Sequence, residues 1–60
     1  MKCFTVSEVA KSIGVGKGYV YELIYTGRLK AIRLSERRFR ISEESLRDFI
    51  REEEGRAVSN

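Results

Sequence analysis

The chain has 60 residues, 12 Lys or Arg against 9 Asp or Glu, and 42% hydrophobic residues. This length allows one domain with a small core and no enclosed active site, and the hydrophobic content is sufficient for a globule. The single cysteine excludes an internal disulfide, and the absence of histidine excludes the usual zinc sites. No apolar run is near the length of a membrane-spanning segment, and no segment has the pattern of a signal peptide. We therefore expect a soluble, cytoplasmic protein that binds no metal, cofactor or membrane.

The charge is unevenly distributed along the chain. Residues 1–41 carry nine basic and three acidic residues, whereas residues 42–60 carry three basic and six acidic residues. A basic body with an acidic C-terminal segment indicates one surface for a polyanion and a different surface for another contact. The simpler interpretation of Glu43 and Glu44 is that carboxylates are favoured at a helix N-terminus.

Residues 6–25 have the spacing of a helix-turn-helix. Thr5 and Glu8 have the spacing of a capping box, which predicts a first helix that runs to about Ile13. Residues 14–16, Gly-Val-Gly, break the helical pattern. The glycines permit the positive φ that a sharp turn between two helices requires.

The second helix is expected from about Lys17 to Thr26, with Gly27 as its C-terminal cap. Val20 and Leu23 are three residues apart and should fill the angle between the two helices. Helix-turn-helices bind DNA or serve as plain scaffolds, so the motif favours nucleic-acid binding without requiring it.

Residues 31–41 alternate apolar and basic side chains, which predicts a β-hairpin with one face toward the core. Its tip, residues 35–38, lacks the glycine of an ideal two-residue turn, so we expect a slightly longer loop. The expected cross-strand pairs are Ile32 with Ile41, Leu34 with Phe39, and Arg33 with Arg40.

Ser42 is expected to cap a third helix whose apolar residues recur with helical spacing and face the core. The fold class that results is mostly α with a small β-hairpin: a winged helix-turn-helix, with a two-stranded wing and a C-terminal third helix. The expected core residues of this helix are Leu46, Phe49 and Ile50, the domain spans residues 1–54, and residues 55–60 form a frayed tail.

The predicted wing has more arginine than a hairpin needs. Like charges directly opposite each other, as expected for Arg33 and Arg40, are unfavourable, and Arg37 and Arg38 add to the repulsion. A phosphate backbone would relieve it, since arginine binds phosphate in a bidentate manner and each contact releases counterions. Such tips also fit the minor groove, whose negative potential attracts arginine. The alternative is an edge hairpin that is kept soluble by charge.

On the second helix, the face opposite the core residues is where a recognition helix contacts the major groove. Few of its side chains can read bases, so we expect modest sequence specificity for each monomer. Tyr19 is expected to pack against the core, whereas two other tyrosines lie too far round the helix. The predicted DNA-contacting residues of this region are Lys17, Gly18, Tyr21, Glu22 and Tyr25, with Arg28 and Lys30 as supporting backbone contacts.

Enzymatic chemistry is not expected. Without histidine, and with one N-terminal cysteine, the usual nucleophile–base pairs cannot form. No glycine-rich loop leads from a strand to a helix, so no nucleotide site is predicted either.

The segments SEVAKSIGV, YVYELI, GRLKAIRL and RRFRISEESLRDFI together resemble the excisionase-type, MerR-like winged helix-turn-helix family over residues 5–50. The resemblance covers all three helices and the wing. Three positions depart from the family pattern: Gly16 replaces a Ser or Thr at the helix start, Lys30 replaces a common Pro, and Ser35 replaces a common Gly. By this resemblance the recognition-helix positions are Lys17, Gly18, Tyr21 and Glu22, and the wing positions are Arg33, Arg37, Arg38 and Arg40.

The resemblance implies sequence-directed binding of double-stranded DNA by an excisionase-like recombination directionality factor. Such a protein bends attachment-site DNA and assists a recombinase (an integrase). The first alternative is a stand-alone MerR-like transcription regulator. A further alternative is a protein-interaction adaptor that uses the basic wing against an acidic partner. For the excisionase-like protein we expect a monomer in solution that assembles cooperatively, head to tail, on DNA.

Overall fold

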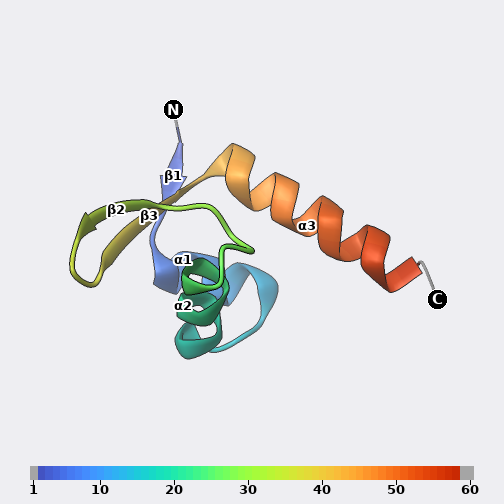
Figure 1. Ribbon diagram of the computed structural model, residues 1–60, viewed down its shortest axis with the longest axis horizontal. Coiled ribbons are helices and arrows are strands. Elements are labelled where there is room, and N and C mark those ends of the chain that lie inside the picture. Colours follow the sequence, from blue (N-terminus) through green and yellow to red (C-terminus); the bar gives the residue numbers. More distant parts are fainter. Residues whose placement is uncertain (1, 59–60) are drawn as a thin grey trace.

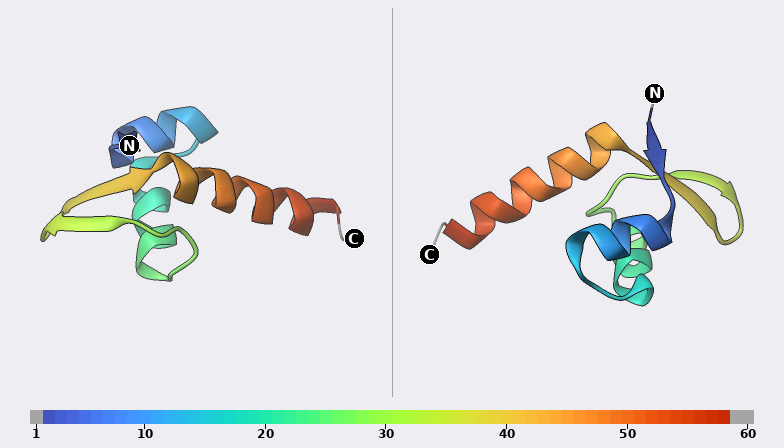
Figure 2. Two further views of the ribbon diagram at one scale, coloured as in Figure 1. Left: turned by 90° about the horizontal axis from the view of Figure 1, so that it is seen from above. Right: turned by 180° about the vertical axis from the view of Figure 1, so that it is seen from behind.

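The structure is a computed structural model and describes residues 2–58. Figure 1 shows helices α1 and α2 packed together beside a small sheet, with the β2–β3 hairpin and helix α3 leading away in opposite directions, and Figure 2 shows the same arrangement from two other sides. This architecture confirms the predicted winged helix-turn-helix. The elements are β1 (Cys3–Phe4), α1 (Val6–Ile13), α2 (Lys17–Tyr25), β2 (Ile32–Ser35), β3 (Arg38–Ser42) and α3 (Glu43–Val58).

Helix α1 begins and ends as the sequence predicts. The Thr5 hydroxyl accepts a hydrogen bond from the Glu8 amide at 3.0 Å, and the Glu8 carboxylate accepts one from the Thr5 amide at 2.9 Å. This reciprocal capping box satisfies two of the four free amides at the helix start. At the other end, Gly14 adopts φ 72°, a left-handed conformation that most side chains disfavour, and the chain turns toward α2.

Helix α2 ends at Tyr25, one residue before the predicted end. Gly27 adopts φ 80°, its amide donates to the Ile24 carbonyl, and the Arg28 amide donates to the Leu23 carbonyl. This is the Schellman pattern, which satisfies the carbonyls of Leu23 and Ile24 as the chain leaves the helix.

The sheet has three strands in the order β1-β3-β2, and strand β1 was not predicted. Cys3 pairs with Ser42, and Phe4 pairs with Ile41. A two-residue strand is too short to show an alternating pattern, so only its partner strand reveals it.

The predicted register of the hairpin is wrong by one residue. The observed pairs are Ile32 with Arg40, Arg33 with Phe39, and Ser35 with Arg38, with a bulge between Arg33 and Ser35. The turn is also shorter than expected, because only Glu36 and Arg37 lie between the paired residues Ser35 and Arg38. One extra residue in a strand reverses the alternation that follows it. Arg33 therefore does not oppose Arg40.

The core lies between α1, α2, β3 and the first half of α3. Leu46 and Phe49 of α3 are buried as predicted, but Ile50, which was also expected in the core, is 37% exposed. Ile32 and Leu34 of β2 are more than half exposed. The ten buried apolar residues are Val6, Val9, Ala10, Val20, Leu23, Leu29, Phe39, Ile41, Leu46 and Phe49.

Helix α3 extends beyond the predicted boundary. The sequence predicted that order would fade after Glu53, yet the helix continues to Val58, and the predicted tail over residues 55–58 is helical. Ion pairs between Arg56 and the carboxylates of Glu52 and Glu53, at 3.6 and 3.9 Å, favour these last turns. The rest of the predicted tail, residues 59–60, lies outside the described residues. Across residues 2–58, the structure contains no helix long and apolar enough to cross a membrane.

Candidate nucleic-acid interface

A cleft of about 200 Å³ lies between the start of α1, helix α2 and the wing formed by β2 and β3. Its walls are basic: α2 contributes one lysine, and the wing contributes three arginines. Thr5, Val6 and Ser7 at the start of α1 also line it. We call this the basic cleft. The predicted DNA-contacting residues that line it are Lys17, Tyr21, Arg37, Arg38 and Arg40.

Tyr21 joins α2 to the wing. Its hydroxyl donates to the main-chain carbonyl of Arg37 at 3.3 Å, and its ring meets the Phe39 ring edge to face at 6.0 Å. Tyr25 stacks on Tyr21 at 6.3 Å and also meets the Phe39 ring. The prediction that Tyr19, rather than Tyr21, packs against the core is therefore wrong: Tyr21 is half-buried and Tyr19 is exposed. The wing forms a wall that the helical pattern alone could not reveal.

Arg33 is bound within its own hairpin. Its guanidinium lies 5.7 Å from the centre of the Phe39 ring and donates to the carbonyls of Ser35, at 3.4 Å, and Glu36, at 3.1 Å. The predicted repulsion with Arg40 is absent, because the bulge places Phe39 opposite Arg33. Arg33 has the contacts of a brace for the turn, and it is not among the residues that line the basic cleft.

The other three wing arginines remain directed at the cleft. Arg40 donates to the carbonyl of Phe39 at 3.0 Å and is half-buried, which fixes its position on β3. Arg37 and Arg38 are exposed at and beside the turn. Since like charges repel within this small volume, the arrangement favours an anionic ligand.

The outward face of α2 carries the remaining predicted recognition-helix residues. Gly18, Glu22 and Tyr25 are exposed, and Tyr25 is open over 62% of its surface. A Cβ atom added at Gly18 would meet nothing within 4 Å. Gly18 is therefore not needed for packing, and its open surface permits close approach of another molecule.

The structure does not bring Arg28 and Lys30 to the basic cleft. Arg28 follows α2 and forms an ion pair with Glu53 of α3 at 2.7 Å. The hydrogen bond that Arg28 donates to the Glu53 carboxylate raises the pKa of Arg28 above its ordinary value. Lys30 lines a separate groove with Asp48 and Glu52 of α3. Both predicted supporting residues thus lie beside acidic groups.

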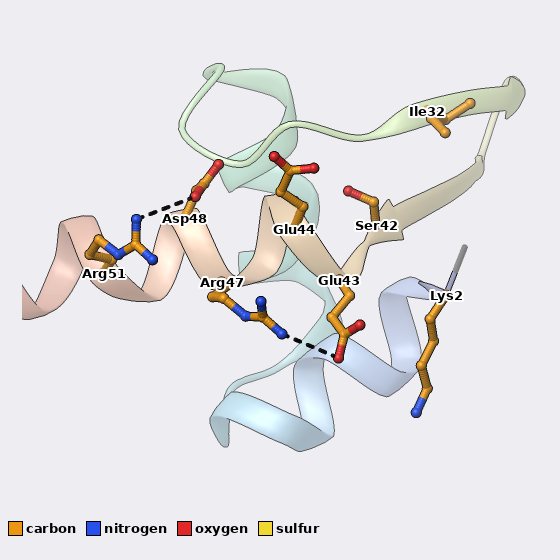
Figure 3. A pocket seen from close by; sticks show the side chains of 8 residues that line it. All are labelled: Lys2, Ile32, Ser42, Glu43, Glu44, Arg47, Asp48 and Arg51. Carbon is orange, nitrogen blue, oxygen red and sulfur yellow. Dashed lines mark ion pairs between the residues drawn. The ribbon is translucent and has the colours of Figure 1, made fainter.

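A larger open groove of about 650 Å³ lies against the first turns of α3 and is shown in Figure 3. Four of its charged side chains pair along the helix, Arg47 with Glu43 at 3.6 Å and Arg51 with Asp48 at 4.0 Å. We call it the α3 groove. It contains none of the predicted DNA-contacting residues, and its mixed charges provide no strong field for an anion.

Comparison with known proteins identifies the family of the chain. Residues 3–54 match the sequence model of a family described as a helix-turn-helix domain. A protein of Streptomyces ambofaciens named excisionase is 41% identical over 54 residues, which cover 90% of this chain and 86% of that relative. The chain belongs to the excisionase-type helix-turn-helix family of DNA-binding proteins. No solved structure matches it significantly.

The matched region of this excisionase-type chain reaches from β1 into α3. It therefore includes α2, the wing and every residue of the basic cleft. It also includes the α3 groove except for Lys2, so it is the concentration of basic side chains, and not the extent of the match, that distinguishes the cleft from that groove.

Proposed function

We propose that the protein binds double-stranded DNA, with α2 in the major groove and the wing along the adjacent minor groove. The observation that carries the proposal is the basic cleft, where Lys17 of α2 and three wing arginines converge. Cations from two separate elements match the two backbone strands that border a groove, and each contact with phosphate would release counterions.

The roles of the side chains follow from their positions. Lys17 and the arginines Arg37, Arg38 and Arg40 bind phosphate or the edge of the minor groove. The outer face of α2, with Gly18 and Glu22, supplies few groups that distinguish bases. Most of the affinity then comes from the backbone and depends strongly on salt, and sequence specificity per monomer is modest.

The biological role that we propose is that of an excisionase-like recombination directionality factor, which bends attachment-site DNA and assists a recombinase. The similarity to the Streptomyces ambofaciens excisionase supports this role. A MerR-like regulator would need a long dimerisation helix with an apolar seam. In α3, every residue from Arg51 to Arg56 is charged or glycine.

We further propose that the protein is a monomer that binds adjacent DNA sites cooperatively, head to tail. The acidic side of α3, with Glu44, Asp48 and Glu52, would meet the basic surface of the neighbouring copy. The same helix face is also a surface that a recombinase could contact.

Two assays test the proposed function. Titration of a labelled duplex at increasing salt should show affinity that falls steeply with salt, and an excess of polyglutamate should not compete. An excision assay with purified recombinase, with and without the protein, separates the recombination role from transcription regulation. Equal binding to polyglutamate and DNA would support an adaptor instead, and excision that is unaffected by the protein would contradict the recombination role.

A further inference from the structure

Leu34 occupies an unexpected place on the wing. Strand alternation predicts that it faces the core opposite Phe39, yet Leu34 is 55% exposed and lies in the bulge between Arg33 and Ser35. A bulge inserts one residue and re-aims the neighbouring side chains, and bulges are frequent beside functional sites. The inserted residue here is a large apolar one, and more than half of its surface is exposed.

The backbone around the bulge is held in place by hydrogen bonds from side chains, in addition to those between the two strands. Arg33 donates to the carbonyls of Ser35 and Glu36, and the Tyr21 hydroxyl donates to the carbonyl of Arg37. Three consecutive carbonyls of the tip are thus bonded by side chains. A tip that is fixed before binding loses little conformational entropy when it enters a groove.

The surroundings of Leu34 are basic. Arg37 and Arg38 follow within four residues, both are exposed, and the turn contains a single acid, Glu36. An apolar side chain flanked by arginines is the combination by which proteins wedge open a base step from the minor groove. The arginines hold the groove, the apolar group replaces the stacking contact, and the duplex kinks.

We propose that Leu34 is a wedge that the wing inserts at a base step in the minor groove, and that this insertion produces the bend in the bound DNA. The inference rests on the proposed function, because it names the residue through which that function deforms its substrate. Arg33 and Tyr21 are positioning residues for the wedge.

Ile32 provides a matched control on the same strand. It is also apolar and 51% exposed, but it lines the α3 groove with Ser42, Glu43 and Glu44, as Figure 3 shows. Carboxylates at that position would repel a phosphate backbone, so Ile32 should take no part in DNA deformation.

The experiment uses the 60-residue protein and a duplex that the wild type selects from a random-sequence pool. Dyes at the two ends report bending by energy transfer, and 2-aminopurine at successive positions reports unstacking. Leu34→Ser should lose roughly half or more of the wild-type bend and the local fluorescence increase, whereas the apolar Leu34→Met should keep both. Ile32→Ser should behave as the wild type does.

The contrary outcomes are distinct. If Leu34→Ser binds, bends and unstacks the duplex as the wild type does, or if Ile32→Ser loses as much, the wedge is wrong and DNA binding still stands. If Leu34→Ser fails to fold, as judged by its thermal melt, the side chain serves the fold and the wedge is also wrong. If the wild type shows no salt-dependent binding to any duplex, the proposed function fails and the wedge fails with it.

Discussion

The guanidinium of Arg28 lies 2.7 Å from the carboxylate of Glu53 and joins the loop after α2 to the second half of α3. The last buried residue of α3 is Phe49, so among residues 50–56 this ion pair is the closest polar link between the helix and the body. The pair therefore ties the second half of α3, which Figure 1 shows leading away from the body, to the loop after α2.

Loss of this pair should loosen the end of α3 and leave DNA binding unchanged. Arg28→Ala should increase amide hydrogen exchange after residue 50, while affinity for a single-site duplex and its salt dependence stay at wild-type values, because Arg28 lies away from the basic cleft. The charge reversal Arg28→Glu with Glu53→Arg should restore protection. A weaker salt dependence in Arg28→Ala would show instead that Arg28 contacts phosphate.

Leu23→Ala should unfold the domain or nearly so. Leu23 is 1% exposed at the centre of a very small core, and such a truncation costs about 2–5 kcal/mol in the free energy of unfolding. The free energy of unfolding of a domain of this size is little larger than that loss. Chemical denaturation measures the change, with the exposed Leu34→Ala as its control. A cooperative transition close to that of the wild type would mean that the core tolerates the cavity.

Tyr21→Phe removes the hydroxyl that bonds the turn of the wing and should loosen that turn, while the ring contacts with Phe39 and Tyr25 remain. The hydrogen bond to the Arg37 carbonyl stabilises the fold by at most about 1 kcal/mol, so the melting temperature should change little. Affinity for DNA should fall several-fold, and this fall should vanish in a variant that already lacks Arg37 and Arg38. The control is Tyr19→Phe, because Tyr19 is exposed and is neither a predicted DNA-contacting residue nor part of the basic cleft. Additive losses in that double-mutant cycle would show that the Tyr21 hydroxyl contacts DNA directly.

The elements that were predicted well are those whose signals are local. The capping box of Thr5 and Glu8 and the positive-φ glycines at 14 and 27 each act within one turn of the chain, so the sequence alone locates both helices of the motif. The four basic side chains of the cleft were also named from the sequence, because alternation and helical spacing brought each to the surface.

What was missed depends on contacts between distant residues. The bulge at Leu34 changes the register by one residue, and a leucine at that position does not predict a bulge. Because of the bulge, Arg33 does not pair with Arg40 as predicted and holds the turn in place instead. The partner of Arg28 lies 25 residues away, so its assignment to the DNA backbone was reasonable from charge alone, and only the folded chain shows the competing carboxylate.

The proposed assembly on DNA has its own test. Sedimentation of the free protein should give a monomer, because α3, over residues 43–56, shows no apolar seam beyond its core contacts. Titration on duplexes with one and two sites, about one helical turn apart, should show tighter binding per site on the tandem duplex. Glu44→Lys with Asp48→Lys should abolish the difference. A stable dimer without DNA, or equal affinity per site, would contradict this proposal.

The central claim, that the basic cleft holds the DNA backbone, is tested most directly by the salt dependence of binding. The slope of log affinity against log salt for a single-site duplex should be steep for the wild type. It should flatten by roughly one unit for each phosphate interaction that Lys17→Ala, Arg38→Ala or Arg40→Ala removes. Arg47→Ala, which removes an exposed arginine from the α3 groove, should leave the slope unchanged. An unchanged slope in all three cleft variants would contradict the account.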